Sequence, residues 1–225
     1  MQTLESAETI VLNGLRRQSP PNSFSGKLKA RLRRNGWKHT LNYAIFVVVL
    51  ERLGVRLTNE YVLDDRSDRS EVCGTNGFVS ETLTKMDQLS ELDCEFLRNY
   101  GECDGFADRF SLGRICHLQR SIDGALACAC WYGPIELTSV KDGDRPGIID
   151  HCFTVPEYRG RGLYPWALHE IVSAQGEGDA PLFFPIFIEC SRFNHSSSAG
   201  IAKAGFTLTK TTLTIGSRAL FTWRA

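Results

Sequence analysis

The sequence predicts an α/β protein, with a mixed sheet of the α+β kind packed against helices. Residues 147–175 indicate this first, because an apolar, β-branched strand passes through a Gly- and Arg-rich turn into a run with helical spacing. Residues 115–132 alternate around an Asp-Gly pair, which is typical of a tight hairpin. A very apolar strand at 183–190 and a short helix at 194–204, ended by Gly205, complete the pattern.

Length and composition are those of a soluble globular protein with a proper core. The chain has 225 residues, of which 42% are hydrophobic and 23% are charged. Lysine and arginine number 26, as do aspartate and glutamate, so the formal net charge is zero. A neutral molecule has no overall attraction to nucleic acid, and we therefore expect no nucleic-acid partner.

The cysteines and the N-terminus favour a reducing compartment. The eight cysteines form no CxxC pair and no zinc-ligand spacing, so the sequence predicts neither a disulfide framework nor a metal site. The acidic start lacks the apolar core of a signal peptide, and the longest apolar run, 44–50, is too short to span a bilayer. We expect a cytoplasmic protein, and the sequence leaves its oligomeric state open.

We expect an N-terminal extension, residues 1–58, ahead of a main domain, residues 59–225. Residues 27–54 have the spacing of an amphipathic helix whose first half, Lys27–Lys38, is basic and carries Trp37. Such a helix either lies on an anionic membrane surface or exposes a solvated basic face while its apolar end packs on the domain. The second interpretation is favoured, because most runs of charge are simply solvated.

The remaining elements are predicted from local spacing and turn residues. They are a strand at 56–63, a loop at 64–77, helices at 81–100 and 102–112, and a final hairpin at 207–223. The apolar face of the first of these helices consists of Leu83, Met86, Leu89, Leu92 and Phe96.

The turn at residues 159–164 has the features of an anion-binding site. The helix that follows tolerates Pro165 in its first turn, where the missing N–H has no partner to lose. At such a helix start, backbone N–H groups and the positive end of the helix dipole point at one spot. Arg159 and Arg161 add full charges, which favours a phosphate or pyrophosphate over the plainer interpretation of a structural glycine turn. The predicted buried helix face is Leu163, Ala167, Leu168, Ile171 and Val172.

Two motifs in the second half of the chain occur together. One is Arg159-Gly160-Arg161-Gly162-Leu163-Tyr164, which follows Thr154-Val155-Pro156, and the other runs from Asn194 to Phe206. With these motifs the chain, from about residue 80 to its C-terminus, resembles the GNAT superfamily of N-acyltransferases. The first motif is similar to the family's R/Q-x-x-G-x-G/A loop and the second to its N-x-x-S/A…K-x-G-F helix. Both motifs stand in order and in the strand–helix context that the family has.

The resemblance implies acetyl-CoA as cosubstrate, no metal, and transfer of an acetyl group to a primary amine of a small-molecule or protein acceptor. The Arg-Gly-Leu-Tyr-Pro form of the loop resembles members that modify amino sugars and cell-surface precursors. Glycines in the loop let the chain approach the pyrophosphate closely. The residues expected to contact the cosubstrate are Thr154, Val155, Arg159, Gly160, Arg161, Gly162, Leu163, Tyr164, Asn194 and Ser197.

Two departures from the family's pattern leave alternatives open. Tyr164 stands where the loop usually ends on a small residue, so the helix contact or the acyl pocket must differ. Ile201 stands where many members carry the tyrosine that protonates the leaving thiolate, so another group, water or no acid serves here. The alternatives are a GNAT fold that binds CoA without turnover, and a membrane-surface acyltransferase that uses a longer acyl donor and the Lys27–Lys38 helix.

Acyl transfer to an amine needs a proton acceptor near the nitrogen. Strand alternation predicts Asp150, Cys152 and Thr154 on one face and His151 on the other. Similar enzymes often place a base four or six residues before the position of Thr154. Six residues before it is Ile148, which cannot serve, so Asp150 is the first candidate for base or amine-orienting group. His151 is the second, and a satisfied structural carboxylate is an equal alternative for Asp150. We expect Cys152 and Cys190 to be core residues rather than acyl-carrying nucleophiles.

Overall fold

The computed structural model describes residues 54–63, 75–100, 105–135, 145–175, 183–215 and 218–224. All of them belong to one compact unit, residues 54–225. The basic helix expected at Lys27–Lys38 lies outside the described residues, as does most of the predicted N-terminal extension.

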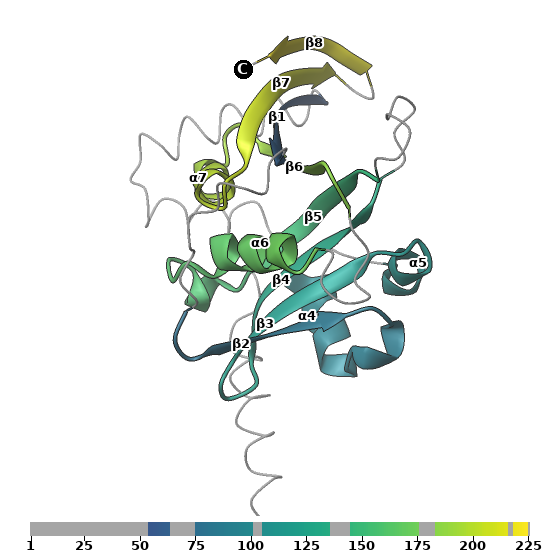
Figure 1. Cartoon of the computed structure of the whole chain (residues 1–225), viewed down its shortest axis with the longest axis vertical. Coiled ribbons are helices and arrows are strands. Elements are labelled where there is room, and N and C mark those ends of the chain that lie inside the picture. Colours follow the sequence, from purple (N-terminus) through teal and green to yellow (C-terminus); the bar gives the residue numbers. More distant parts are fainter. Residues whose placement is uncertain are drawn as a thin grey trace, which may run out of the picture. The chain divides into compact units, whose positions relative to one another are not determined.

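The described strands form one mixed sheet (Figure 1), in the order β2-β3-β4-β5-β6-β1-β7-β8. Neighbouring strands are antiparallel throughout, except that β5 and β6 are parallel. The strands are β1 (Val55–Leu63), β2 (Phe78–Leu83), β3 (Ile115–Ser121), β4 (Leu126–Pro134), β5 (Gly147–Thr154), β6 (Ile186–Ser191), β7 (Thr207–Ile215) and β8 (Arg218–Arg224).

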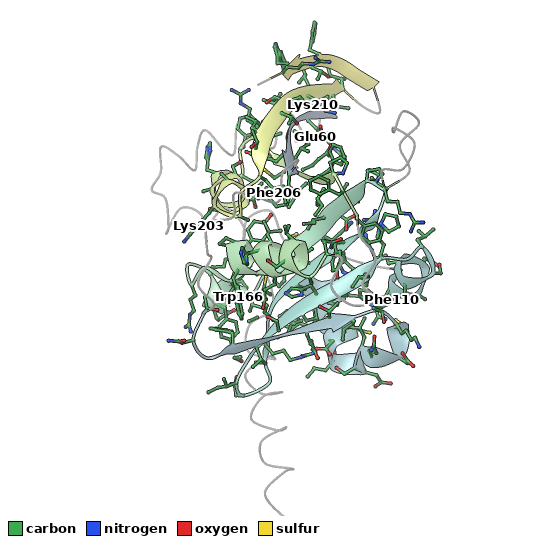
Figure 2. All side chains as sticks on the ribbon, viewed as in Figure 1. Glu60, Phe110, Trp166, Lys203, Phe206 and Lys210 are labelled. Carbon is green, nitrogen blue, oxygen red and sulfur yellow. The ribbon has the colours of Figure 1, made fainter. Side chains whose placement is uncertain are left out.

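Helices cover both faces of the sheet. On one face, Leu168 of α6 packs in a core with Cys128 and Cys130 of β4. On the other, Leu97 of α4 and Phe106 of α5 pack in a second core with Trp131, and Figure 2 shows Phe110 of α5 on the same side. The helices are α4 (Glu91–Tyr100), α5 (Phe106–Ser111), α6 (Leu163–Ser173) and α7 (His195–Lys203), with short 3₁₀ turns at Met86–Gln88 and Pro156–Tyr158.

Local patterns predicted most of these elements correctly. The hairpin β3–β4 turns at Gly124, whose φ of 86° is the left-handed conformation that an Asp-Gly turn requires. The five residues predicted for the apolar face of α6 are all buried. Helix α7 ends just before Gly205, with a φ of 91°, as the sequence predicts for a glycine after a helix.

The helix predicted for residues 81–100 is wrong in its first half. Residues 78–83 form β2, which pairs with β3 so that Thr82 stands opposite His117, and α4 begins only at Glu91. Leu83 and Leu89 reach the core from a strand and from the end of a 3₁₀ turn, whereas Leu92 is 44% exposed. Strand pairing with a distant segment therefore overrode the helical spacing.

Strand β1 lies in the middle of the sheet, between β6 and β7. Its predicted position is confirmed, and it begins at Val55, within the last residues of the expected extension. Glu60 of β1 binds Lys210 of β7 at 2.8 Å, a pair that Figure 2 labels. The C-terminal hairpin β7–β8 is thus joined to the sheet through a strand from the other end of the described chain.

A partly buried ion pair ties α4 to the sheet. Both Asp93 carboxylate oxygens accept hydrogen bonds from the Arg120 guanidinium of β3 at 2.8 Å, and Glu81 of β2 binds the same arginine. Burial acts to raise the pKa of Asp93, but the hydrogen bonds from Arg120 and Ser90 outweigh it and hold the pKa below its usual value. The carboxylate form of Asp93 is therefore the one that the fold stabilises.

Replacing Asp93 with Asn should destabilise the domain by up to about 3 kcal/mol, the low end for breaking a buried pair, because Glu81 still faces Arg120. The folded-state pKa of Asp93 is depressed, so the pair's contribution is complete at neutral pH and is lost as the pH falls through that pKa. In urea unfolding, the deficit of the variant should shrink below about pH 4.

The exposed Glu95→Gln on the same helix is the control and should stay within about 0.5 kcal/mol of wild type. A deficit of equal size at neutral and acid pH would contradict the assigned role of the Asp93 carboxylate.

Candidate functional site

Strands β5 and β6 stay paired over only part of their length. Their register joins Gly147–Ile149 to Ile186–Ile188, yet β5 continues to Thr154 and β6 to Ser191. Beyond this point neither strand supplies the other with a ladder of hydrogen bonds. The middle of the sheet therefore offers a place where a ligand can meet backbone groups of both strands.

A β-bulge interrupts β5 at the same level. Asp150 pairs with Trp131 of β4, and Phe153 pairs with Ala129. Between these two pairs β5 therefore contains one residue more than β4. His151 has a φ of 45°, a conformation that residues other than glycine rarely adopt. Held conformations of this kind are common at functional sites.

The bulge overturns the strand alternation expected for β5. Asp150 bonds to Arg109 of α5, and the Phe153 ring lies 6.1 Å from that of Phe96 of α4, so both face the α4–α5 side. Thr154 instead approaches Cys128 on the α6 side, with 3.5 Å between its Oγ1 and the sulfur. Asp150 and Thr154 therefore do not share a face, because the extra residue inverts the alternation between them.

Both oxygens of the Asp150 carboxylate are engaged by arginines. Oδ1 lies 3.2 Å from Arg109 and Oδ2 lies 3.5 Å from Arg114, which also donates to the Ile148 carbonyl at 3.2 Å. The Arg109 guanidinium stands over the Trp131 ring, 5.4 Å from its centre. This arrangement fixes Asp150 in place. The His151 side chain is exposed at the bulge beside it.

The loop between β5 and α6 makes the tight glycine turn before a helix that the sequence predicts. Gly160 and Gly162 have φ values of 80° and 79°, which close a tight turn immediately before α6. Arg159 donates from Nε to the Thr154 carbonyl at 2.9 Å, and the Arg161 guanidinium stands 5.4 Å from the centre of the Tyr158 ring. Both arginines are exposed, so the surface around the loop carries positive charge.

Asn194 and Ser197 stand together at the start of α7. The Asn194 side chain accepts a hydrogen bond from the Ser197 backbone N–H at 3.3 Å and so caps the helix. Asn194 is exposed and Ser197 is partly buried. This cap fixes where α7 begins, while the helix itself packs against α6.

Tyr164 fills space that a glycine of α7 leaves open. A Cβ atom placed on Gly200 would lie 2.6 Å from Cδ1 of Tyr164, so the ring packs directly on the helix backbone. The large residue on α6 is thus matched by a small one on α7. The next residue, Ile201, is completely buried and belongs to the core.

The Tyr164 hydroxyl stays protonated. Burial is the main cause that raises its pKa well above the ordinary value, and the nearby thiols of Cys152, Cys130 and Cys190 act in the same direction. These three cysteines come from β5, β4 and β6. The ring is therefore partly enclosed close to the point where β5 and β6 part, with a neutral O–H group.

The thiols of Cys130 and Cys190 are poor nucleophiles. Burial raises the pKa of Cys190, and hydrogen bonds with the Cys128 and Cys152 thiols, together with burial, raise that of Cys130. A thiol that stays neutral is inert in acyl transfer. Within the described ranges, no three histidine, cysteine, aspartate or glutamate residues are grouped in a way that could hold a metal ion.

Sequence reasoning missed Glu189 of β6. It stands opposite Glu60 in the β1–β6 pairing, and its side chain is exposed. Partial burial of the carboxylate is the first cause that raises its pKa, and the Glu60 carboxylate is the second. One signal could have found it, because Glu189 is the only charged residue in the apolar run Phe183–Cys190.

Comparison with known proteins gives the fold. The chain is similar to a GNAT-family acetyltransferase from Colwellia psychrerythraea, with a TM-score of 0.50 and 13% identity over 77% of this chain and 60% of that one. A GCN5-related N-acetyltransferase from Sphaerobacter thermophilus gives 0.48 and 15% identity over 74% and 54%. A GNAT-family acetyltransferase from Novosphingobium aromaticivorans gives 0.45 and 19% over 71% and 62%.

The fold is therefore of the GNAT type, as the sequence predicts, with a mixed sheet and few helices. The chain spans less than two thirds of the length of each of these three structures. No protein-family model matches the sequence, and no curated protein is similar to it in sequence.

Replacing Gly200 with Ala should reveal the contact with Tyr164. In the wild-type background the new methyl group meets the ring, and overpacking should lower the free energy of unfolding by about 1–3 kcal/mol. In a Tyr164→Ala background the clash disappears, and the same change should stabilise α7 by up to about 1 kcal/mol, because alanine is the better helix former.

Urea unfolding of the four proteins in this double-mutant cycle measures the coupling. If Gly200→Ala is equally costly in both backgrounds, the Tyr164 ring does not lie against α7.

Proposed function

We propose that the chain is an acyl-CoA-dependent N-acyltransferase, which transfers an acetyl group from acetyl-CoA to a primary amine. One observation carries the proposal. The glycine loop at the start of α6 directly follows a bulged strand that parts from its parallel neighbour, in a sheet of the GNAT type. This places an anion-binding turn next to an opening in the sheet.

The loop is suited to the pyrophosphate of CoA. The N–H groups of Gly162, Leu163 and Tyr164 belong to the end of the helix where backbone donors have no intrahelical acceptor. The turn made by Gly160 and Gly162 permits close approach, and Arg159 and Arg161 supply positive charge at the surface. The residues present therefore fit a diphosphate group.

The separation of β5 and β6 is suited to the pantetheine arm. An amide-containing chain can hydrogen-bond to the backbone of a strand that has lost its neighbour, as an added strand does. We assign this role to Thr154 and Val155 at the end of β5, with Asn194 and Ser197 at the start of α7 on the far side of the arm. The thioester would then lie close to the bulge.

The transfer joins two bond changes. The nitrogen–carbon bond forms as the carbon–sulfur bond breaks, the nitrogen loses a proton, and the sulfur leaves with the electron pair of its bond. Asp150, held by two arginines, is placed to orient the amine, and His151 is the second candidate for a group in contact with it. The acceptor is a small-molecule or protein amine, and amino sugars or cell-surface precursors are favoured. The protein itself is placed in the cytoplasm.

We assign protonation of the leaving sulfur to Tyr164. Its hydroxyl is neutral and near the sulfurs of Cys152 and Cys190, on the two strands that part. Ile201, on α7, has no proton to give. The Tyr164 ring on α6 can take up this position because Gly200 has no side chain that would occupy the space.

Two other functions remain open to experiment. Ile201 favours a module that binds CoA without turnover, since no acid projects from α7 at that position. A membrane-surface acyltransferase with a longer acyl donor depends on Lys27–Lys38, which lies outside the described residues. None of the described helices is long and apolar enough to cross a membrane.

Thiol release from acetyl-CoA, measured with a panel of amines that includes amino sugars and peptides, tests the proposal. The wild type should release thiol faster when the right amine is present. Gly162→Ala should weaken CoA binding about 5- to 30-fold, because alanine disfavours the left-handed conformation by about 1–2 kcal/mol and would distort the loop.

Gly124→Ala is a matched control, because Gly124 has a φ of 86° and an added methyl group would meet nothing within 4 Å. It should suffer similar backbone strain and yet keep wild-type CoA affinity. Binding of CoA without thiol release by any amine would favour the binding module, and failure to bind CoA would refute both functions.

Tyr164→Phe should lower kcat about 100-fold or more while leaving CoA affinity and stability unchanged, since only the hydroxyl is lost. The ring would still pack on Gly200. Tyr158→Phe, whose hydroxyl lies 3.4 Å from Ser121, is the control and should turn over normally. An unaltered kcat in Tyr164→Phe would mean that water protonates the sulfur.

A further inference from the structure

Asp150 and Glu189 flank the point where β5 and β6 separate. The last paired residues, Ile149 and Ile188, both lie in the core under α6. Side chains alternate along a strand, so the next residue on each strand faces the opposite side of the sheet. Those residues are Asp150 and Glu189. Each stands one residue beyond the last pair, so the two carboxylates lie on either side of the point where the strands separate.

The two carboxylates differ in their partners. Asp150 is bound on both oxygens, by Arg109 and Arg114. Glu189 forms no ion pair within the described ranges, and across the strand pair it stands opposite Glu60. An acceptor group must have an oxygen to spare, and of the two side chains Glu189 has it.

The charges around Glu189 favour uptake of a proton. On β1 it stands opposite Glu60, which binds Lys210 of β7 at 2.8 Å. On β5, Asp150 with its two arginines lies one residue beyond the last residue that pairs with β6. Partial burial first and the Glu60 carboxylate second raise the pKa of Glu189, while Lys210 acts to lower it. A carboxylate that is less acidic than usual is a better general base near neutral pH.

We propose that Glu189 accepts the proton that the acceptor nitrogen loses as the nitrogen–carbon bond forms, while Asp150 orients the amine. The assignment rests on the proposed acyl transfer. The proton passes from the nitrogen to a carboxylate oxygen of Glu189, directly or through one water, and the electron pair of the broken carbon–sulfur bond leaves on sulfur. The guanidinium groups on the Asp150 wall favour a neutral, nucleophilic amine over an ammonium ion.

The first test is the pH dependence of kcat/KM for the amine. Glu189→Gln should lower kcat at least about 100-fold and abolish the acid limb of the profile. Asp150→Asn should raise KM for the amine and keep the acid limb. The exposed Glu95→Gln of α4 should behave as wild type.

Glu60→Gln gives a readout that a purely structural role would not produce. Removing the neighbouring negative charge, and releasing Lys210 from its partner, should lower the pKa of Glu189. The acid limb should therefore move to lower pH in an enzyme that still turns over. A limb that stays in place in Glu60→Gln would overturn the assignment.

Unfolding measurements exclude a trivial loss of structure in Glu189→Gln. A carboxyl whose folded-state pKa is raised contributes stability at low pH, and that contribution is lost as the pH rises through the folded pKa. At neutral pH the ionised side chain is thus disfavoured by folding, and glutamine should leave the domain at least as stable as wild type.

The outcomes separate the two proposals. No amine-stimulated thiol release by the wild type would contradict acyl transfer itself. Wild-type turnover, together with an unchanged rate and pH profile in Glu189→Gln, would overturn the role of Glu189 alone.

Discussion

One extra residue in β5 determines the geometry on which the rest of the candidate site depends. Holding His151 at a φ of 45° costs on the order of 1–3 kcal/mol, and the bulge persists because both of its flanks are fixed. Asp150 stands opposite Trp131 and Phe153 opposite Ala129, in a β4 strand that is almost entirely buried. Packing of β4 between two cores thus over-determines the distortion.

The bulge also divides the site into two sides. It turns Asp150 toward α5 and leaves Thr154 toward α6, although the two residues would share a face in a regular strand. The anion loop and Tyr164 belong to the α6 side, whereas the carboxylates belong to the other. A thioester between the two sides would be met by a proton donor from one and by the amine from the other. This division follows from the one extra residue that the bulge adds to β5.

The sequence predicted the elements whose causes are local. The Asp-Gly hairpin at Gly124, the glycine loop before α6 and the end of α7 at Gly205 each depend on a few adjacent residues, and all three are confirmed. It failed where distant segments decide the outcome. Residues 78–83 are a strand because β3 is beside them, and the faces of β5 depend on its register with β4. Glu189 stands out locally as a charge in an apolar run, but its position opposite Glu60 is set by the pairing of β6 with β1.

Tyr164 and Ile201, the two departures from the GNAT pattern, are linked by one packing contact. Taken singly, Tyr164 is too large for its place in the loop and Ile201 lacks a hydroxyl. In the fold, Tyr164 packs on Gly200, the residue directly before Ile201. The large side chain on α6 is therefore accommodated by the missing side chain of Gly200 on α7. A polar group at position 201 would have to be accommodated where the side chain is completely buried, beside the Tyr164 ring. With the hydroxyl on α6 instead, the α6–α7 contact carries the O–H of Tyr164, and position 201 keeps an apolar residue in the core.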